Sequence, residues 1–250
     1  MKKHSSPATI SLEPNKHELL DLLEHYQNRR YVDAEKLALL LTKKFENHPF
    51  GWKVLGAIFN QTGRLSEGLI ACQKSALLEP KNPEAHNNLG NTLQKLERLK
   101  EAEESYRKAI KLKQDYSEAH NNLGNILVEF GSLEDALASF KKAIELKPNY
   151  AEAHYNQGNV HQEMGRIEEA EKYYRKAIEL KSNYAAAHNN LGITLKNLGK
   201  LEEAEKSYIK AIELKPKFSA ALLNRGQLLV ERGEFERSLK YFDLCNTKNS

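Results

Sequence analysis

Asparagine is the residue most regularly placed in this chain to form hydrogen bonds. One set recurs at intervals of 34 residues, at Asn88, Asn122, Asn156, Asn190 and Asn224. A second set stands three residues further along, at Asn91, Asn125 and Asn159, which is the same face of a helix. A side-chain amide has donors and an acceptor, so it suits the alternating N–H and C=O groups of a peptide backbone. Both sets are therefore candidates to bind an extended peptide.

The same asparagines have a second interpretation, in which they hydrogen-bond within or between repeats and shape the array. Neighbouring helices lie about 8–10 Å apart, and an extended peptide advances about 3.3 Å per residue. If the asparagines bind a peptide, this spacing would place one asparagine opposite roughly every three residues of the peptide. We favour peptide contact for the first set, and both interpretations stay open for the second.

Histidines also recur once per repeat, at His86, His120, His154 and His188. Zinc needs several ligands within about 2.1 Å of one point, whereas neighbouring helices are about 8–10 Å apart. These histidines occupy the position that Trp52 fills earlier, so we expect them to pack between helices. The sequence has no nucleophile–base pair, phosphate loop or metal-ligand set, and we predict no catalytic residue, metal or cofactor.

Apolar spacing predicts that each repeat consists of two helices joined by a short turn. Trp52, Leu55 and Phe59 are three or four residues apart, which places them on one helix face. A turn residue follows each first helix, and it is glycine at Gly131, Gly165, Gly199 and Gly233. Glycine is favoured where a helix ends in a left-handed conformation. Glu97 stands at this position in one repeat and is a local departure.

Small and large residues alternate along the predicted second helices. Alanines recur at Ala102, Ala136, Ala170 and Ala204 and again seven residues later at Ala109, Ala143, Ala177 and Ala211. Large aromatic residues stand between these two sets in the repeats, at Tyr106, Phe140, Tyr174 and Tyr208, and Phe242 occupies the same position in the last repeat. Small residues beside large ones at fixed positions are typical of closely packed helix pairs.

This 34-residue pattern resembles the tetratricopeptide repeat. The matching residues in two of the units are Trp52, Leu55-Gly56 and Pro80, and Leu123-Gly124, Ala136, Phe140, Ala143 and Pro148. The last unit departs most, because Arg225 replaces a leucine and Ser238 and Cys245 replace alanines. The resemblance implies an all-α fold, a right-handed α-solenoid of antiparallel helix pairs with a concave groove lined by the first helices.

The repeats predict how the chain is divided. Residues 1–14 are expected to be disordered, and residues 15–48 to form a degenerate helix pair of the same kind. Residues 49–250 are expected to form six repeats that start near residues 49, 83, 117, 151, 185 and 219.

The resemblance implies a non-enzymatic scaffold for protein–protein interaction that binds a protein or peptide in its groove. A similar ladder of asparagines lines the repeat domain of the O-linked N-acetylglucosamine transferases, where it holds substrate peptide. The catalytic domain of those enzymes has no counterpart here. The alternative is therefore an N-terminal segment that recruits substrates or partners to a larger enzyme of the glycosyltransferase or sulfotransferase kind.

Self-assembly is a third interpretation. The last predicted helix carries Leu239, Tyr241, Phe242 and Leu244, and no further repeat follows in this sequence. An apolar face at this position predicts either a continuing chain or contact with another copy through end-to-end stacking of repeats.

Composition argues against several other classes of partner. The net charge of +4 is too small to indicate nucleic-acid binding by itself. No apolar run approaches the roughly 20 residues that span a bilayer, and the N-terminus lacks the apolar region of a secretory signal. Cys72 and Cys245 have no disulfide or zinc spacing, so a cytoplasmic location is expected.

Overall fold

The computed structural model describes residues 13–246, and these residues form helices without strands. The first twelve residues of the segment predicted to be disordered lie outside the described part. The fourteen helices of the described residues are α1 (Lys16–Gln27), α2 (Tyr31–Lys44), α3 (Pro49–Gln61), α4 (Leu65–Leu78), α5 (Pro83–Lys95), α6 (Leu99–Leu112), α7 (Ser117–Glu129), α8 (Leu133–Leu146), α9 (Ala151–Glu163), α10 (Ile167–Leu180), α11 (Ala185–Asn197), α12 (Leu201–Leu214), α13 (Ser219–Glu231) and α14 (Phe235–Asn246). The all-α prediction is confirmed.

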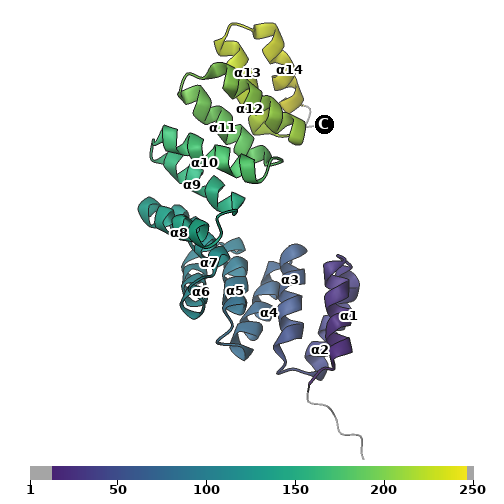
Figure 1. Ribbon diagram of the computed structural model, residues 1–250. Helices are drawn as coiled ribbons and strands as arrows, with labels where there is room; N and C mark the ends of the chain where they lie inside the picture. Colours follow the sequence, from purple (N-terminus) through teal and green to yellow (C-terminus); the bar gives the residue numbers. More distant parts are fainter. Residues whose placement is uncertain (1–12, 247–250) are drawn as a thin grey trace, which may run out of the picture. The chain divides into compact units, whose positions relative to one another are not determined.

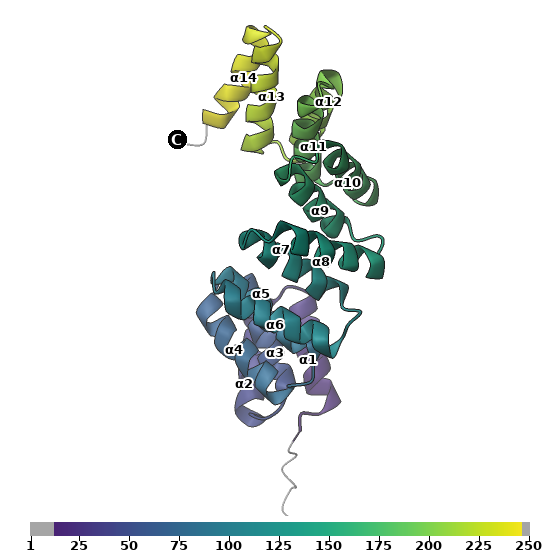
Figure 2. The same ribbon diagram turned by 90° about the vertical axis from the view of Figure 1, so that its left-hand side faces the viewer.

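The helices form two compact units, residues 1–115 with α1 to α6 and residues 116–250 with α7 to α14 (Figure 1). Within each unit, every odd-numbered helix packs against the even-numbered helix that follows it, and that helix packs against the next odd-numbered one. Successive odd-numbered helices of a unit also contact each other. Each unit is therefore a stack of helix pairs, and Figure 2 shows the pairs from a second direction.

From the α5–α6 pair onward, an aromatic ring of the second helix lies on a glycine of the first helix, whereas in the α3–α4 pair the equivalent Gly56 faces Cys72. A Cβ atom added at Gly124 would come within 2.6 Å of the Phe140 ring, and one added at Gly192 within 2.5 Å of the Tyr208 ring. The same contact joins Gly90 to Tyr106, Gly158 to Tyr174 and Gly226 to Phe242. A side chain at the glycine position would displace the ring, so the Leu-Gly pair and the aromatic of the motif form one packing unit.

The turn between the two helices of a repeat requires a left-handed backbone. The turn glycines have φ of +72° at Gly131 and Gly165 and +73° at Gly199, which confirms the expected reason for glycine. Glu97 occupies the same position with φ of +58°. A residue with a Cβ atom is strained there, because the left-handed conformation brings Cβ close to the following carbonyl oxygen.

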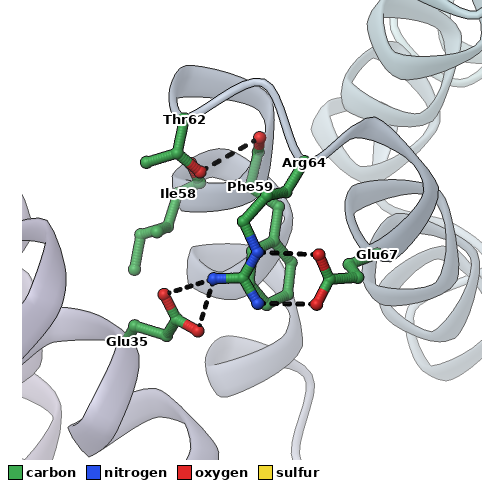
Figure 3. Close-up of polar contacts among 6 residues, drawn as sticks. All are labelled: Glu35, Ile58, Phe59, Thr62, Arg64 and Glu67. Atoms are coloured by element: carbon green, nitrogen blue, oxygen red, sulfur yellow. Dashed lines mark hydrogen bonds and ion pairs between the residues drawn. The ribbon is translucent and has the colours of Figure 1, made fainter.

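Arg64, just before α4, ties two neighbouring helix pairs together in the first unit. It donates to Glu67 of α4 and to Glu35 of the preceding pair, with Nη1 2.7 Å from Glu35 Oε1 (Figure 3). Its guanidinium also lies 4.4 Å from the centroid of the Phe59 ring. Because Arg64 is exposed, water screens these ion pairs, and they orient the helices more than they stabilise them.

Replacing Glu97 with glycine is expected to stabilise the protein. Glycine adopts positive φ without a Cβ clash, which is expected to raise the free energy of unfolding by about 0.5–1 kcal/mol. Urea unfolding followed by circular dichroism measures the change. The matched control is Glu104→Gly, in the exposed middle of α6, which is expected to destabilise by about 1 kcal/mol. Equal destabilisation by both substitutions would contradict the strain at Glu97.

Candidate functional site

The five asparagines of the first set, here called the asparagine column, occupy equivalent positions on first helices. Asn88 lies on α5 in the first unit, and Asn122, Asn156, Asn190 and Asn224 lie on α7, α9, α11 and α13 in the second. All five are half-buried, and so are Asn91, Asn125 and Asn159 one turn further along. They are therefore reachable from solvent but are also in contact with neighbouring helices.

Two amides of the column donate to a buried asparagine of the preceding repeat. Asn156 Nδ2 lies 3.0 Å from Asn121 Oδ1, and Asn224 Nδ2 lies 2.9 Å from Asn189 Oδ1. Asn121 and Asn189 are only 5% and 4% exposed. These are bonds between repeats, of the kind that the second interpretation of the asparagines expects.

Asn190 makes a denser set of contacts with the repeat before it. Its Nδ2 lies 3.1 Å from the Tyr155 hydroxyl and 3.0 Å from Asn159 Oδ1, and its own Oδ1 accepts from Asn189 Nδ2 at 3.1 Å. The amide plane of Asn190 is therefore fixed by its own helix and by the preceding first helix.

The second set of asparagines contacts the aromatic rings of the core. The Tyr106 hydroxyl lies 2.8 Å from Asn91 Oδ1, and the Tyr174 hydroxyl lies 2.8 Å from Asn159 Oδ1. Burial raises the pKa of both tyrosines above its usual value, so they stay protonated as donors. Asn125 stands in the repeat whose ring is Phe140, which has no hydroxyl. Among the described residues its side chain makes no hydrogen bond.

The bonded amides of the column keep part of their hydrogen-bonding capacity. An asparagine side chain has two N–H groups and an oxygen with two lone pairs. Asn156 and Asn224 each use one N–H group towards the neighbouring repeat. Their remaining N–H group and oxygen stay available, with an orientation that the inter-repeat bond fixes.

The first unit has a polar hollow of about 290 Å³ beside Asn88. Its lining comes from α1, α3 and α5, and comprises Tyr26, Ala57, Asn60, Gln61, Asn88, Asn91, Gln94 and Lys95. Within the described residues the Asn88 amide makes no hydrogen bond; its backbone carbonyl accepts from Thr92. Asn88 and Asn125 thus present complete amides.

Sequence reasoning missed most of the lining of this hollow. Tyr26 belongs to the degenerate first pair, where no motif marks it, and Lys95 takes part by donating to the Asn60 carbonyl at 3.1 Å. One sequence feature could have pointed to this lining, namely a polar residue that recurs on the first helices. Gln94 has the polar equivalent Gln162 two repeats later, although Val128 stands in the repeat between them.

Three of the recurring histidines bind the backbone of the linker before their repeat. The Nε2 atoms of His86 and His154 each lie 3.0 Å from the carbonyl oxygen six residues earlier, at Pro80 and Pro148, and His188 Nε2 lies 3.1 Å from Ser182 O. Burial lowers the pKa of all three histidines, so the neutral Nε2–H form donates to these carbonyls. Among residues 13–246, no three His, Cys, Asp or Glu side chains are grouped to hold a metal ion.

The aromatic residues before the first helices of the second unit are half-buried and covered by lysines. Lys147 Nζ lies 4.6 Å from the centroid of the Tyr150 ring and 3.3 Å from Glu118. Lys181 repeats this arrangement with Tyr184 and Glu152. The rings therefore contribute to the junction between repeats, and the two glutamates are paired with cations.

Comparison with known proteins identifies the repeat. Two family models described as Tetratricopeptide repeat match residues 83–116 and 149–217, and one described as TPR repeat matches residues 124–165. A search of curated protein sequences found no match. No helix within the described range is long and apolar enough to span a membrane.

Solved structures share the architecture. The pilF protein of Pseudomonas aeruginosa is 22% identical, with a TM-score of 0.73 over 81% of this chain and 93% of that one. TTC0263, a thermophilic TPR protein of Thermus thermophilus, is 25% identical, with a TM-score of 0.62 over 73% of this chain and 100% of that one. YrrB, a TPR protein with an unusual peptide-binding site, is 25% identical, with a TM-score of 0.57 over 70% of this chain and 90% of that one.

Asn156→Ala is expected to destabilise the second unit by about 1–3 kcal/mol, because the buried Asn121 oxygen loses its donor. Asn88→Ala is the matched control at the equivalent position and is expected to stay within about 0.5 kcal/mol of the parent. Urea unfolding measures both. The double variant Asn121→Ala/Asn156→Ala tests the pairing, because it is expected to cost less than the sum of its single variants. Additive costs would show that the two side chains are not coupled.

Proposed function

The chain belongs to the tetratricopeptide repeat proteins, and we propose that this protein-interaction scaffold binds an extended peptide segment along its asparagine column. The observation that carries the proposal is the state of the amides in both asparagine sets. Asn88 and Asn125 have complete amides in half-buried positions. Asn156, Asn190 and Asn224 are held in place by the repeat before them.

Fixed amides suit recognition of a peptide backbone rather than of particular side chains. A peptide that binds them does not have to immobilise long, flexible side chains of the scaffold, which lowers the entropic cost of association. The inter-repeat bonds of the column therefore support the binding interpretation as well as the structural one. A fixed N–H group or oxygen can face the alternating groups of an extended strand.

Within the first unit, the hollow beside Asn88 offers a place for one side chain of a bound peptide. Its lining is polar except for Ala57 and the Tyr26 ring. Lys95 is the charged residue of this lining. A polar or acidic side chain fits this chemistry better than a basic one. YrrB, to which the chain is similar, is described as having a peptide-binding site.

We propose that the chain itself is not catalytic, in agreement with the family, whose members are typically scaffolds. The partner we propose is a protein or peptide, not nucleic acid or a membrane. A cytoplasmic location is part of the proposal and is supported by the two cysteines, which are both free.

The binding proposal can be tested with peptides selected from a random phage-displayed library against the full chain. Their affinities are then measured by fluorescence anisotropy for the parent, Asn88→Ala and Asn125→Ala. Neither substitution removes a side-chain hydrogen bond within the described residues, so a loss of affinity reports on the ligand. We expect about three- to tenfold weaker binding for the substitution that faces the peptide.

Two further measurements distinguish backbone recognition from other modes. N-methylation of alternate peptide amides is expected to weaken binding by about tenfold or more, whereas scrambling the side chains should have a smaller effect. Lys108→Ala, on the exposed face of α6, is the control variant. Peptides that bind both asparagine variants as tightly as the parent and tolerate N-methylation would overturn the proposal.

Self-association through the last repeat is a second candidate, and a specific observation favours it. On α14, Phe235 and Leu239 are 63% and 61% exposed, and Leu244 is 46% exposed. The residue equivalent to Phe235 in the preceding repeat is Leu201, which is half-buried. A second copy packed on this face would cover the three side chains.

Light scattering of the full chain across a hundredfold range of concentration tests this candidate. We expect the apparent mass to rise with concentration, and Leu239→Glu to abolish the rise because it places a charge in the apolar face. Leu77→Glu is the matched control, since Leu77 is 72% exposed on α4 in the other unit. A constant monomer mass in the parent would refute self-association through α14.

A further inference from the structure

One repeat of the second unit has a polar interior where its neighbours are apolar. The first helices α7 and α11 have Leu123 and Leu191 at one inward position and Leu127 and Leu195 four residues later. At these two positions α9 has Gln157 and His161. Both are nonetheless buried, with exposures of 5% and 8%.

Three buried polar atoms of this repeat have no hydrogen-bond partner among the described residues. They are His154 Nδ1, Gln157 Oε1 and His161 Nδ1. His154 uses its other ring nitrogen towards the Pro148 carbonyl, which leaves Nδ1 as a lone-pair acceptor. Each of these atoms has lost its bulk hydration on folding without gaining a hydrogen bond from the described residues. Opening the repeat to water would restore that hydration.

Tyr173 of α10 closes over these side chains. Its ring stacks on His161 with centroids 5.1 Å apart and planes at 6°, and it lies 6.2 Å from the His154 ring. The neighbouring repeats have Ser139 and Ser207 at this position. In this repeat the larger aromatic side chain fills the space around two imidazoles and packs against their neutral rings.

We propose that α9 and α10 form the helix pair of the second unit that opens most readily, and that mild acidification drives this opening through His154 and His161. Among the described residues, no carboxylate makes an ion pair or hydrogen bond with either imidazole in the stacked, closed arrangement. Protonation in the closed state would place a charge on a largely buried ring that packs against Tyr173.

The charged groups around the two imidazoles do not reverse the effect of burial, which disfavours their protonated forms. His154 faces Lys176 and Glu179 of α10, which act in opposite directions. His161 faces Arg166 of the turn, Glu169 of α10 and Glu134 of α8. Burial outweighs these charges and lowers the pKa of both histidines.

The direction of the pH dependence follows from these lowered pKa values. As the pH falls through roughly 6.5, the open state takes up protons before the closed state does. The closed state therefore loses stability from about pH 7 downward, until the histidines also protonate when closed. In α11 and α12, burial lowers the pKa of His188 alone, so that pair should respond more weakly.

Opening of this pair would interrupt the asparagine column. Asn156 lies on α9, and Asn190 of the next repeat depends on Tyr155 and Asn159 of the same helix. Release of a bound peptide at acidic pH is the consequence. This consequence rests on the peptide-binding function proposed above, whereas the opening itself does not.

Hydrogen exchange of the full chain without ligand, measured by mass spectrometry at pH 7.4 and pH 5.5, tests the opening. After correction for intrinsic exchange rates, the slowest amides of α9 and α10 are expected to exchange at least about tenfold faster than those of α7–α8 and α11–α12. We expect the difference from α11–α12 to widen by roughly a further tenfold at pH 5.5, because one additional histidine takes up a proton.

Two variants test the cause. Gln157→Leu/His161→Leu gives α9 the residues of its neighbours and should remove both the faster exchange and its extra pH dependence. The reciprocal variant, Leu191→Gln/Leu195→His, should transfer faster exchange to α11–α12. Uniform protection of the three pairs in the parent protein would overturn the proposal, as would rapid exchange of α9–α10 that is unaffected by pH. Both of these outcomes are read without any variant.

Discussion

The contact between an aromatic ring and a glycine is the constraint on which the five helix pairs from α5–α6 to α13–α14 depend. Because Gly90, Gly124, Gly158, Gly192 and Gly226 lack a Cβ atom, the ring of the second helix can lie directly on the first. The close approach fixes the distance between the two helices and removes the ring from water, as the complete burial of Tyr106, Phe140 and Tyr174 shows. Any larger residue would separate the pair and leave voids around the ring.

Ring burial also decides what the polar residues nearby can do. A buried tyrosine hydroxyl needs an acceptor, and Asn91 and Asn159 provide one. Phe140 has no hydroxyl group, so Asn125 does not have to accept a hydrogen bond from the ring. The second set of asparagines therefore divides according to the chemistry of the ring beneath it, and only part of it is available to a ligand.

Repetition in the sequence was sufficient to predict the helix pairs and the turn glycines. The positions of Gly131 and Gly199 follow from a backbone requirement that is local to the turn, and the structure bears it out. The bonds between repeats were not predictable in the same way. Asn121 and Asn189 accept hydrogen bonds from the following repeat, whereas the equivalent residue in the repeat between them is Tyr155, whose hydroxyl accepts from Asn190. Which of two adjacent polar residues faces a neighbouring repeat depends on how each helix is rotated about its own axis in the stack. The periodicity of a single helix does not determine that rotation.

In the function proposed here, binding and stability are coupled in the asparagine column because the same amides would contribute to both. An amide that donates to the repeat before it is held in one orientation, which favours recognition of a rigid backbone but also makes the site depend on every junction in the stack. A column built of free amides such as Asn88 would tolerate the loss of a neighbouring repeat, but its side chains would have to be ordered by the ligand. The second unit has bonded amides at Asn156, Asn190 and Asn224. A ligand that spans this unit would therefore stabilise the junctions that position its own contacts, since it binds only the stacked state. Under the proposed function, this linkage would make peptide affinity and the stability of the stack two measures of the same inter-repeat hydrogen bonds.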